Sequence, residues 1–218
     1  MEMNKKKVGL IISIVVLVII FTIWSILVAN HKLDAIDKTI VNGIVSSRGD
    51  KYNFIYWLNR ITTEFGYTYV IVGIIIVALI ICKLSTKSLI LAGMTLFTKI
   101  SNDFVKNIIN RPRPAEDFRW MSESSSSYPS GHTMTATFFY GFIAYLIIRS
   151  NLNKKIKYSL FGICVFLIPW VGLTRMILSV HYFSDVIGGF LGGIVMISIA
   201  ILLFEIIGDR KIIKNKSE

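Results

Sequence analysis

Long apolar runs separated by short polar segments dominate this sequence. Residues 8–29 contain no charged side chain, and a helix of that length, at about 1.5 Å per residue, crosses about 30 Å of hydrocarbon. Similar runs recur along the chain. We place six membrane spans at about residues 8–29, 67–82, 88–105, 130–148, 158–173 and 182–207. The pattern therefore predicts an all-α fold, a six-transmembrane helical bundle formed by a single domain over residues 1–218.

The connection between the first two runs, residues 30–66, has a different pattern. Apolar positions recur there at helical spacing, opposite charged ones. In the first half the apolar face holds Leu33, Ile36, Ile40, Val41, Ile44 and Val45, and the charged face holds Lys32, Asp34, Asp37 and Lys38. In the second half Phe54, Ile55, Leu58 and Ile61 repeat the pattern around Trp57. We expect amphipathic helices in this loop, either in the lipid interface or packed as a cap over the bundle.

The distribution of charge supports a membrane protein and argues against a nucleic-acid partner. The net charge is +11 and 54% of the residues are hydrophobic, but the basic residues gather in short segments between apolar runs rather than in one patch. Six spans place both termini on the same side, where lysine and arginine are densest. The positive-inside rule then predicts a multi-pass plasma-membrane protein with both termini cytoplasmic and the longer loops outside.

Small residues interrupt the last apolar run. Gly188, Gly189, Gly192 and Gly193 lie in its first half. Small residues at helix interfaces in membranes let two backbones approach closely. We therefore expect the last helix to pack tightly against a neighbour along this stretch.

Three polar stretches are expected to share the outer face of the bundle. They are Lys106, separated by six residues from Arg113-Pro114; Pro129-Ser130-Gly131-His132; and Thr174-Arg175, followed after five residues by His181 and after three more by Asp185. Each has an ordinary explanation when taken alone. A lysine can reach the interface from the end of a span, and a serine can cap a helix. A single His–Asp pair is more often a structural hydrogen bond than a catalytic pair.

His181 and Asp185 nevertheless suit nucleophilic chemistry. Residues four apart share one face of a helix, so we expect the two side chains to touch. A carboxylate bonded to one imidazole nitrogen fixes the tautomer and leaves the other nitrogen free to attack. Arg175 lies off that face and is expected to close the preceding helix and to bind an anion.

Together the three stretches resemble the type 2 phosphatidic acid phosphatase superfamily. Its signature is Lys-x6-Arg-Pro, then Pro-Ser-Gly-His, then Ser-Arg-x5-His-x3-Asp, and this sequence matches it in order and spacing. Thr174 stands where the signature has serine, and it keeps the hydroxyl group. The resemblance covers the chain from about the third span onward. The six-span layout is similar to the family's small bacterial lipid phosphatases, such as phosphatidylglycerophosphatase B and undecaprenyl pyrophosphate phosphatases.

The resemblance implies a fold of the haloperoxidase type and a role for each matching residue. His181 would attack phosphorus and form a phosphohistidine, Asp185 would hold its other nitrogen, and His132 would act as the acid and then the base. Phosphoryl transfer depends on positioning and on stabilising charge on the phosphoryl oxygens. The groups expected to bind the phosphate are Lys106, Arg113, Arg175 and the backbone N–H groups of Ser130, Gly131 and His132 at a helix start. We expect no metal and no cofactor.

The expected activity is hydrolysis of a membrane lipid phosphate on the outer face of the bilayer. Candidate substrates are phosphatidylglycerophosphate, undecaprenyl pyrophosphate and phosphatidate. Two alternatives stay open: phosphoryl transfer to another lipid, and a non-catalytic lipid-binding or transport protein. Lys99 and Asp103, four apart in the third run and outside the signature, are expected to neutralise each other in the bundle interior or to orient Lys106. The oligomeric state, and a lid function for the loop over residues 111–129, are left open by the sequence.

Overall fold

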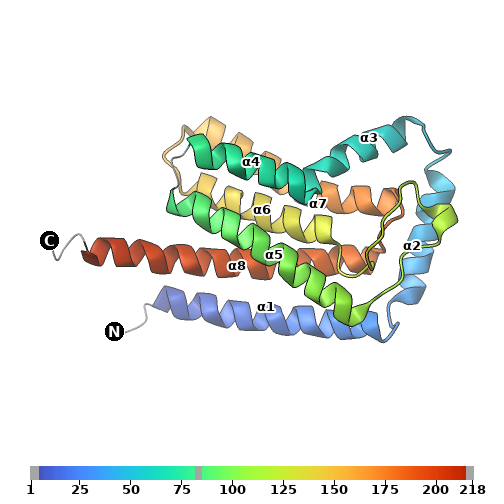
Figure 1. Ribbon diagram of the computed structural model, residues 1–218, viewed down its shortest axis with the longest axis horizontal. Helices are drawn as coiled ribbons and strands as arrows, with labels where there is room; N and C mark the ends of the chain where they lie inside the picture. The colour runs from blue at the N-terminus through green and yellow to red at the C-terminus, as the bar shows by residue number, and fades with distance from the viewer. Residues whose placement is uncertain (1–4, 82–84, 215–218) are drawn as a thin grey trace.

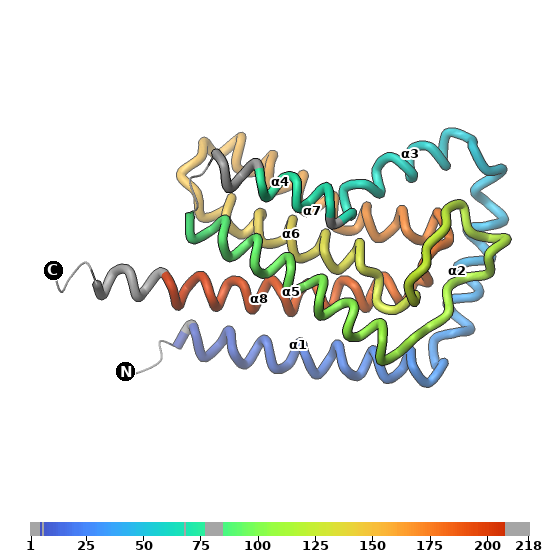
Figure 2. The backbone as a smooth tube through the Cα atoms, in the orientation of Figure 1, coloured from blue at the N-terminus to red at the C-terminus, as the bar shows by residue number. Residues whose placement is uncertain are grey.

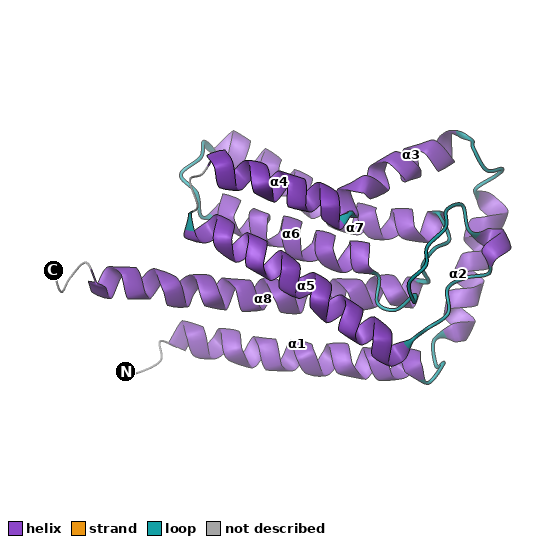
Figure 3. Ribbon diagram, in the orientation of Figure 1, coloured by secondary structure: helices purple, strands orange, loops and turns teal. Residues whose placement is uncertain are grey.

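The computed structural model describes residues 5–81 and 85–214, and the described chain is helical and free of strands (Figure 3). The α-helices are α1 (Lys5–Ala29), α2 (Asp34–Ser47), α3 (Phe54–Thr62), α4 (Thr68–Ile81), α5 (Thr86–Ile109), α6 (Gly131–Ile148), α7 (Lys154–Ile177) and α8 (Phe183–Lys214). Two short 3-10 helices, η1 (Thr63–Gly66) and η2 (Glu116–Phe118), join them. The all-α prediction is therefore confirmed.

Helix α6 lies at the centre of the bundle. It packs against α8, α7 and α5, while α1 packs along α8 and α4 along α5. The core holds fully buried Phe138 and Phe142 from α6, Val171 from α7 and Ala200 from α8. Burial of such side chains stabilises the bundle because they contact one another closely. These contacts fix the relative positions of the helix ends that carry the polar residues.

The glycines of α8 permit the close approach that the sequence predicted. A Cβ added at Gly193 would lie 2.4 Å from the Cβ of Thr137 on α6, and one added at Gly192 would lie 3.1 Å from the side chain of Met134. Real Cβ atoms do not approach a neighbouring backbone or branched side chain so closely. The small residues are therefore what lets α8 lie directly on α6.

Four of the six predicted spans coincide with helices long and apolar enough to cross a membrane, namely Lys7–Ala29, Gly131–Ile148, Lys154–Ile177 and Phe183–Ile207. Helix α4 contains only 14 described residues, and residue 82 of its predicted span lies outside the described part of the chain. Helix α5 is 24 residues long but carries Lys99, Asp103 and Lys106 along its apolar sequence. The number of spans beyond these four remains a prediction.

The two ends of the bundle differ in character. The start of α1 and the end of α8 lie at one end, whereas α2, α3 and the loop between α5 and α6 lie at the other (Figures 1 and 2). The first helix is tied to this second end by hydrogen bonds, because the Nε1 of Trp24 donates to the carbonyl of Ser184 at 3.0 Å. The polar signature residues also belong to this end.

The first long loop forms helices α2 and α3. On α2 Asp37 of the charged face is 1% exposed, whereas Ile36 of the apolar face is 53% exposed. Asp37 is buried because it pairs with a buried arginine, Arg111. The position of these helices in the lipid interface remains a prediction. On α3, Phe54 and Trp57 are exposed.

Candidate active site

The three signature stretches converge at the end of the bundle opposite the termini. Lys106 comes from the last turn of α5, Arg113 from the following loop, His132 from the first turn of α6, and Arg175 from the last turn of α7. His181 lies in the turn between α7 and α8. Residues from three helices and two loops thus meet, as expected for stretches on one face of the bundle.

His181 and Asp185 contact each other, but not on one continuous helix. Helix α7 ends at Ile177, the chain turns through Ser179 with φ +50°, and α8 begins at Phe183. The prediction of a shared helical face was therefore wrong, although the contact it implied exists. The Nδ1 of His181 lies 3.4 Å from the Oδ2 of Asp185, which also accepts the backbone N–H of Tyr182 at 2.8 Å.

Asp185 is fully buried and is held by two further side chains. The hydroxyl of Ser127 donates to its Oδ2 at 2.5 Å, and the Nη1 of Arg111 donates to its Oδ1 at 2.7 Å. Every carboxylate oxygen therefore has a strong partner, so the orientation of Asp185 towards His181 is fixed.

Arg111 in turn is fixed by α2. Its Nη2 donates to Asp37 at 2.7 Å and to Asp34 at 3.2 Å. Asp37 also accepts the backbone N–H of Ser184 at 2.9 Å and its hydroxyl at 2.5 Å. A buried network therefore runs from α2 through Arg111 to Asp185.

The other nitrogen of His181 faces Arg113. Its Nε2 lies 3.2 Å from the Nη1 of Arg113, which donates to the carbonyl of Val180 at 2.7 Å. The Nε of Arg113 donates to the carbonyl of Ser125 at 2.7 Å. Burial lowers the pKa of Arg113 to about 10, which leaves it charged at neutral pH. A fixed cation therefore stands beside the histidine nitrogen that is not turned towards Asp185.

Glu123 joins two of the predicted phosphate-binding cations. Its Oε1 accepts a hydrogen bond from the Nη2 of Arg175, and its Oε2 lies 3.9 Å from the Nη2 of Arg113. Arg175 is fully buried and also donates to the hydroxyl of Thr63 at 3.1 Å, while its Nε has no hydrogen-bond partner among the described residues. An anion already lies between the two arginines.

His132 lies on the other side of the same space. Its ring meets the ring of Tyr67 edge-on, with centroids 4.2 Å apart, and its buried Nε2 has no hydrogen-bond partner within the described chain. A Cβ added at Gly66 would lie 3.1 Å from the Cβ of His132 and 2.6 Å from Val171. Only glycine at position 66 therefore lets η1 approach the histidine this closely.

Lys106 and the start of α6 complete the polar wall. The Nζ of Lys106 donates to the carbonyl of Ser126 and lies 3.5 Å from that of Ser127. Ser130 occupies the N-cap position of α6, but its side chain caps no backbone group and its N–H donates to the carbonyl of Asp185 at 3.0 Å. A Cβ at Gly131 would lie 3.0 Å from the Oδ1 of Asn102. The close packing at Gly131 fixes the helix start.

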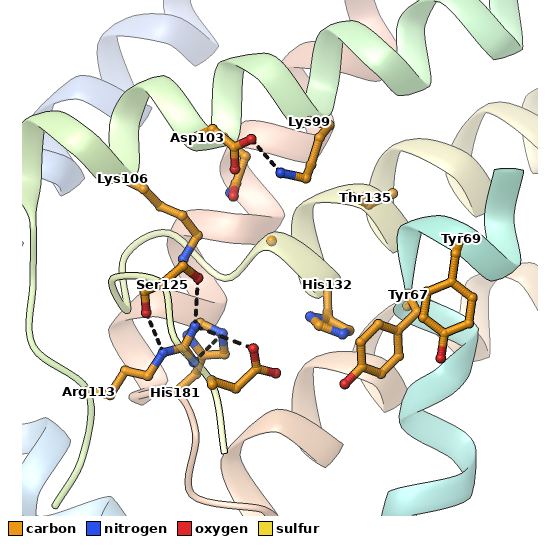
Figure 4. Close-up of a pocket in the computed structure, with 14 residues that line it drawn as sticks. Tyr67, Tyr69, Lys99, Asp103, Lys106, Arg113, Ser125, His132, Thr135 and His181 are labelled. Atoms are coloured by element: carbon orange, nitrogen blue, oxygen red, sulfur yellow. Dashed lines mark hydrogen bonds and ion pairs between the residues drawn. The ribbon is translucent and has the colours of Figure 1, made fainter. Parts of the chain in front are cut away.

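Several of these side chains surround a cavity of about 210 Å³ (Figure 4), whereas the buried Arg175 and Asp185 lie behind its wall. Its lining includes Lys106, Arg113, Glu123, Gly131, His132 and His181, together with Tyr67, Tyr69, Lys99 and Asp103. In the close-up His132 and His181 project from different elements towards the same space. Among the described residues no group of three or more histidine, cysteine or acidic side chains is arranged to hold a metal ion.

Lys99 and Asp103 pair with each other, as expected, but not in the bundle interior. Lys99 donates to the Asp103 carboxylate, and the side chains are 47% and 48% exposed. Both side chains line the cavity. The ammonium group of Lys106 donates to the carbonyl of Ser126 in the loop.

Several polar residues of the site lie outside the motifs. Arg111 stands two residues before Arg113, in an Arg-Pro-Arg-Pro segment that offered a signal. Asp37, Ser127 and Glu123 offered none, because a single aspartate, one serine of a run and one loop glutamate are common in polar loops. Their roles depend on contacts between distant parts of the chain.

Comparison with known proteins agrees with this geometry. The sequence profile of the PAP2 superfamily matches residues 87–208. Phosphatidylglycerophosphatase B of Bacillus subtilis (strain 168) is 30% identical over 218 residues, covering 90% of this chain and 94% of that protein. The fold is similar to the crystal structure of a transmembrane PAP2-type phosphatidylglycerolphosphate phosphatase from Bacillus subtilis, with a TM-score of 0.76 and 26% identity over 88% of this chain and 96% of that one.

A second solved structure has a more distant fold. The crystal structure of Aquifex aeolicus LpxE has a TM-score of 0.54 and 27% identity over 76% of this chain and 94% of that one. The sequence profile spans more than half of this chain, and a relative at 30% identity aligns along most of it. The residues, the fold and these relatives agree, and the chain belongs to the PAP2 superfamily.

Proposed function

We propose that this chain is an integral membrane phosphatase that removes the terminal phosphate of phosphatidylglycerophosphate through a phosphohistidine on His181. The observation that carries the proposal is the position of His181, buried between Asp185 and Arg113 on the wall of a cavity that His132 also lines. The similarity to phosphatidylglycerophosphatase B supports the choice of lipid.

The first step is attack by the Nε2 of His181 on phosphorus. A bond forms between Nε2 and phosphorus as the bond from phosphorus to the lipid oxygen breaks. Burial, and next the charge of Arg113, keep the pKa of His181 well below its ordinary value, so the ring is neutral at neutral pH and keeps its lone pair. Because the Nη1 of Arg113 lies 3.2 Å from Nε2, attack requires this contact to open. Asp185 stabilises the positive charge that the ring acquires on attack.

His132 is the proposed acid and base. The ring would be protonated when the anionic substrate is bound, and its unpartnered Nε2 would then donate the proton to the leaving lipid oxygen and become neutral. In the second step the same nitrogen takes a proton from water, whose oxygen attacks phosphorus and releases inorganic phosphate from His181. One group thus serves both steps, and the protons balance.

Cations and backbone donors stabilise the transferring phosphoryl group. Lys106, Arg113 and Arg175 supply three positive charges, and the N–H groups at the start of α6, at Gly131 and His132, add the positive end of a helix dipole. The N–H of Ser130 is bonded to Asp185 in this structure, so its contribution requires that bond to open. No metal and no cofactor enters this scheme.

The proposed setting is a six-span protein of the plasma membrane. The termini would be cytoplasmic, by the distribution of lysine and arginine, and the active site would face the opposite side. The exposed Phe54 and Trp57 of α3 would then lie in the lipid interface at the depth of the site. A lipid phosphate reaches such a site while its acyl chains stay in the bilayer.

Activity of the purified protein in detergent micelles tests the proposal. Release of inorganic phosphate is measured from phosphatidylglycerophosphate, phosphatidate and undecaprenyl pyrophosphate in the presence of EDTA, and the first substrate is expected to react most efficiently. Activity that EDTA abolishes and magnesium restores would contradict the metal-independent scheme. Transfer of phosphate to an added lipid acceptor would indicate a phosphotransferase, and binding without turnover would indicate a lipid-binding protein.

A further inference from the structure

The ion pair of Lys99 and Asp103 takes no part in the chemistry just described, although both side chains line the cavity. The pair belongs to one turn of α5, and each side chain is about half exposed at 47% and 48%. Both residues lie within the predicted third span, where ionisable side chains are costly and usually mark a functional site. Their place on the cavity wall points to a contact with the substrate.

The position of Lys99 relative to the catalytic cations is fixed by the helix. It precedes Lys106 by seven residues, which places it about 10 Å farther along the axis of α5. Lys99 also lines a second cavity of about 230 Å³ between α4 and α5, whose other lining residues are Val72, Ile75, Ile76, Ala92, Thr95 and Leu96. Lys99 thus lies where the polar cavity meets this second, mostly apolar cavity, which we call the apolar groove.

We propose that Lys99 and Asp103 form a subsite for the part of the substrate between the reacting phosphate and the acyl chains. The ligand is a lipid whose second phosphate is a diester one glycerol unit away from the phosphate that is removed. Lys99 donates to an oxygen of this diester, and Asp103 accepts a hydrogen bond from the glycerol hydroxyl. This inference rests on the proposed function and assigns the residues that select among lipid phosphates.

The distance between Lys99 and the cations Lys106 and Arg113 favours a headgroup whose two phosphates are separated by glycerol. In a pyrophosphate lipid the two phosphorus atoms share one bridging oxygen, so the second phosphate would stay close to Lys106 and Arg113. A phosphatidate has no second phosphate and leaves Lys99 paired with Asp103. Only a spacer such as glycerol carries a second anion towards Lys99 and leads the acyl chains into the apolar groove.

The first experiment compares the wild type with Lys99→Gln in matched detergent micelles. For phosphatidylglycerophosphate we expect kcat/KM to fall by about tenfold or more, the effect of losing a charge-assisted hydrogen bond. For phosphatidate we expect a change of less than about twofold, because no interaction made with that substrate is lost. An equal fall for both substrates would overturn the proposal, because it would show a general structural role.

The second experiment exchanges the charges in the double variant Lys99→Asp with Asp103→Lys. The exchange keeps an ion pair at the same helical spacing but moves the cation about 6 Å towards Lys106. We expect efficiency on phosphatidylglycerophosphate to stay reduced and efficiency on undecaprenyl pyrophosphate to rise. Wild-type efficiency on phosphatidylglycerophosphate in this variant would show that only pairing matters, and would overturn the proposal.

A binding measurement separates failure of the subsite from failure of the proposed function. Phosphatidylglycerol, which carries the diester and the glycerol but no terminal phosphate, is titrated against wild type and Lys99→Gln, with thermal stabilisation in detergent as the readout. We expect weaker binding to the variant by about tenfold. Inactivity of the wild type on all three substrates would reject the proposed function, and equal binding of phosphatidylglycerol to both proteins would reject the subsite.

Discussion

Glu123, on the wall of the cavity where the substrate phosphate is expected to bind, accepts a hydrogen bond from the buried Arg175. The carboxylate also approaches Arg113, so it lies between two cations proposed to bind phosphate. A phosphate that uses both guanidinium groups must displace it. Glu123 would therefore compete with the phosphate for these two arginines.

Replacing Glu123 by glutamine is expected to strengthen the binding of phosphate analogues. Glutamine keeps the size of the side chain but removes the charge that competes for Arg175. We expect the inhibition constant of vanadate, which adopts the five-coordinate geometry of the transition state, to fall several-fold. Glu116→Gln, at an exposed position of η2 outside the cavity lining, is the matched control. An unchanged or higher inhibition constant for Glu123→Gln would show that the carboxylate helps to hold the phosphate.

The two histidines are expected to fail at different steps. His181→Ala should abolish both turnover and formation of a covalent phosphoenzyme, because it removes the attacking nitrogen. His132→Ala should lower turnover by about 100-fold or more, the usual effect of losing a general acid and base. Rapid quenching with radiolabelled lipid phosphate measures the phosphoenzyme directly. Phosphohistidine trapped in the His181 variant would reverse the assignment.

Asp37 is expected to be needed for both stability and activity, although it lies on a different helix from every signature residue. Asp37→Asn leaves the buried Arg111 with a weaker partner, and breaking a buried ion pair costs about 3–5 kcal/mol. Because Arg111 also holds Asp185, kcat should fall while KM changes little. Thermal unfolding and initial rates in detergent measure the two effects.

Asp34→Asn provides the control for that variant. Asp34 contacts the same guanidinium at 3.2 Å but its side chain is 34% exposed, and partly exposed pairs contribute about 0–1 kcal/mol. The unfolding temperature and kcat should stay close to the wild-type values. Similar losses in the two variants would mean that α2 acts as a whole and that Asp37 has no special role.

The contrast between Asp37 and the signature residues shows what the sequence could predict. The predicted span layout placed Lys106, Arg113 and His132 at the same end of the bundle, and the structure brings them to one cavity. The length and composition of the apolar runs likewise predicted an all-helical bundle. The burial of Asp37 on α2 was not predicted, because hydrophobic periodicity carries no information about a buried cation such as Arg111 that requires a carboxylate partner.

A similar limit explains the error at His181 and Asp185. Their spacing of four predicted contact, and contact was found, but through a turn. Ser179 adopts a left-handed conformation and the chain reverses there, a choice set by tertiary contacts. Arg48 of the first loop, for example, donates to the carbonyl of Ile177 at 2.5 Å and to the hydroxyl of Ser179 at 2.7 Å. No local sequence pattern signals an anchor so distant in the chain.

The dependence of the rate on pH should reflect the lowered pKa of His181. Burial and the nearby Arg113 disfavour the protonated ring, so the nucleophile stays neutral until the pH falls well below the ordinary histidine value of about 6.5. Activity that depends on neutral His181 is thus present above the lowered pKa and lost only below it. The test is the rate of phosphoenzyme formation between pH 5 and 8. Each rate is divided by the fraction of substrate present as the dianion, so that titration of the substrate does not enter the profile. A fall with its midpoint at about pH 6.5 would show that His181 titrates as an ordinary histidine.

Gly189 is expected to be essential for the position of the active-site helix α6. A Cβ added there would lie 2.8 Å from the carbonyl oxygen of Ser130 and 3.1 Å from the backbone nitrogen of Met134, so the start of α6 would have to move. Overpacking of this kind costs about 1–3 kcal/mol, and the displacement would carry His132 with it. Gly189→Ala should therefore lower both the unfolding temperature and kcat.

Gly162→Ala is the matched control for Gly189→Ala. Gly162 lies within α7, and a Cβ there would meet nothing within 4 Å. Alanine is favoured over glycine inside a helix by about 0.5–1 kcal/mol, so this variant should be at least as stable as the wild type and equally active. The pair of variants separates the effect of a methyl group on helix propensity from its effect on the contact between α8 and α6. Wild-type stability and kcat in Gly189→Ala would mean that the start of α6 can move without disturbing the chemistry, and that close packing on α8 does not position His132.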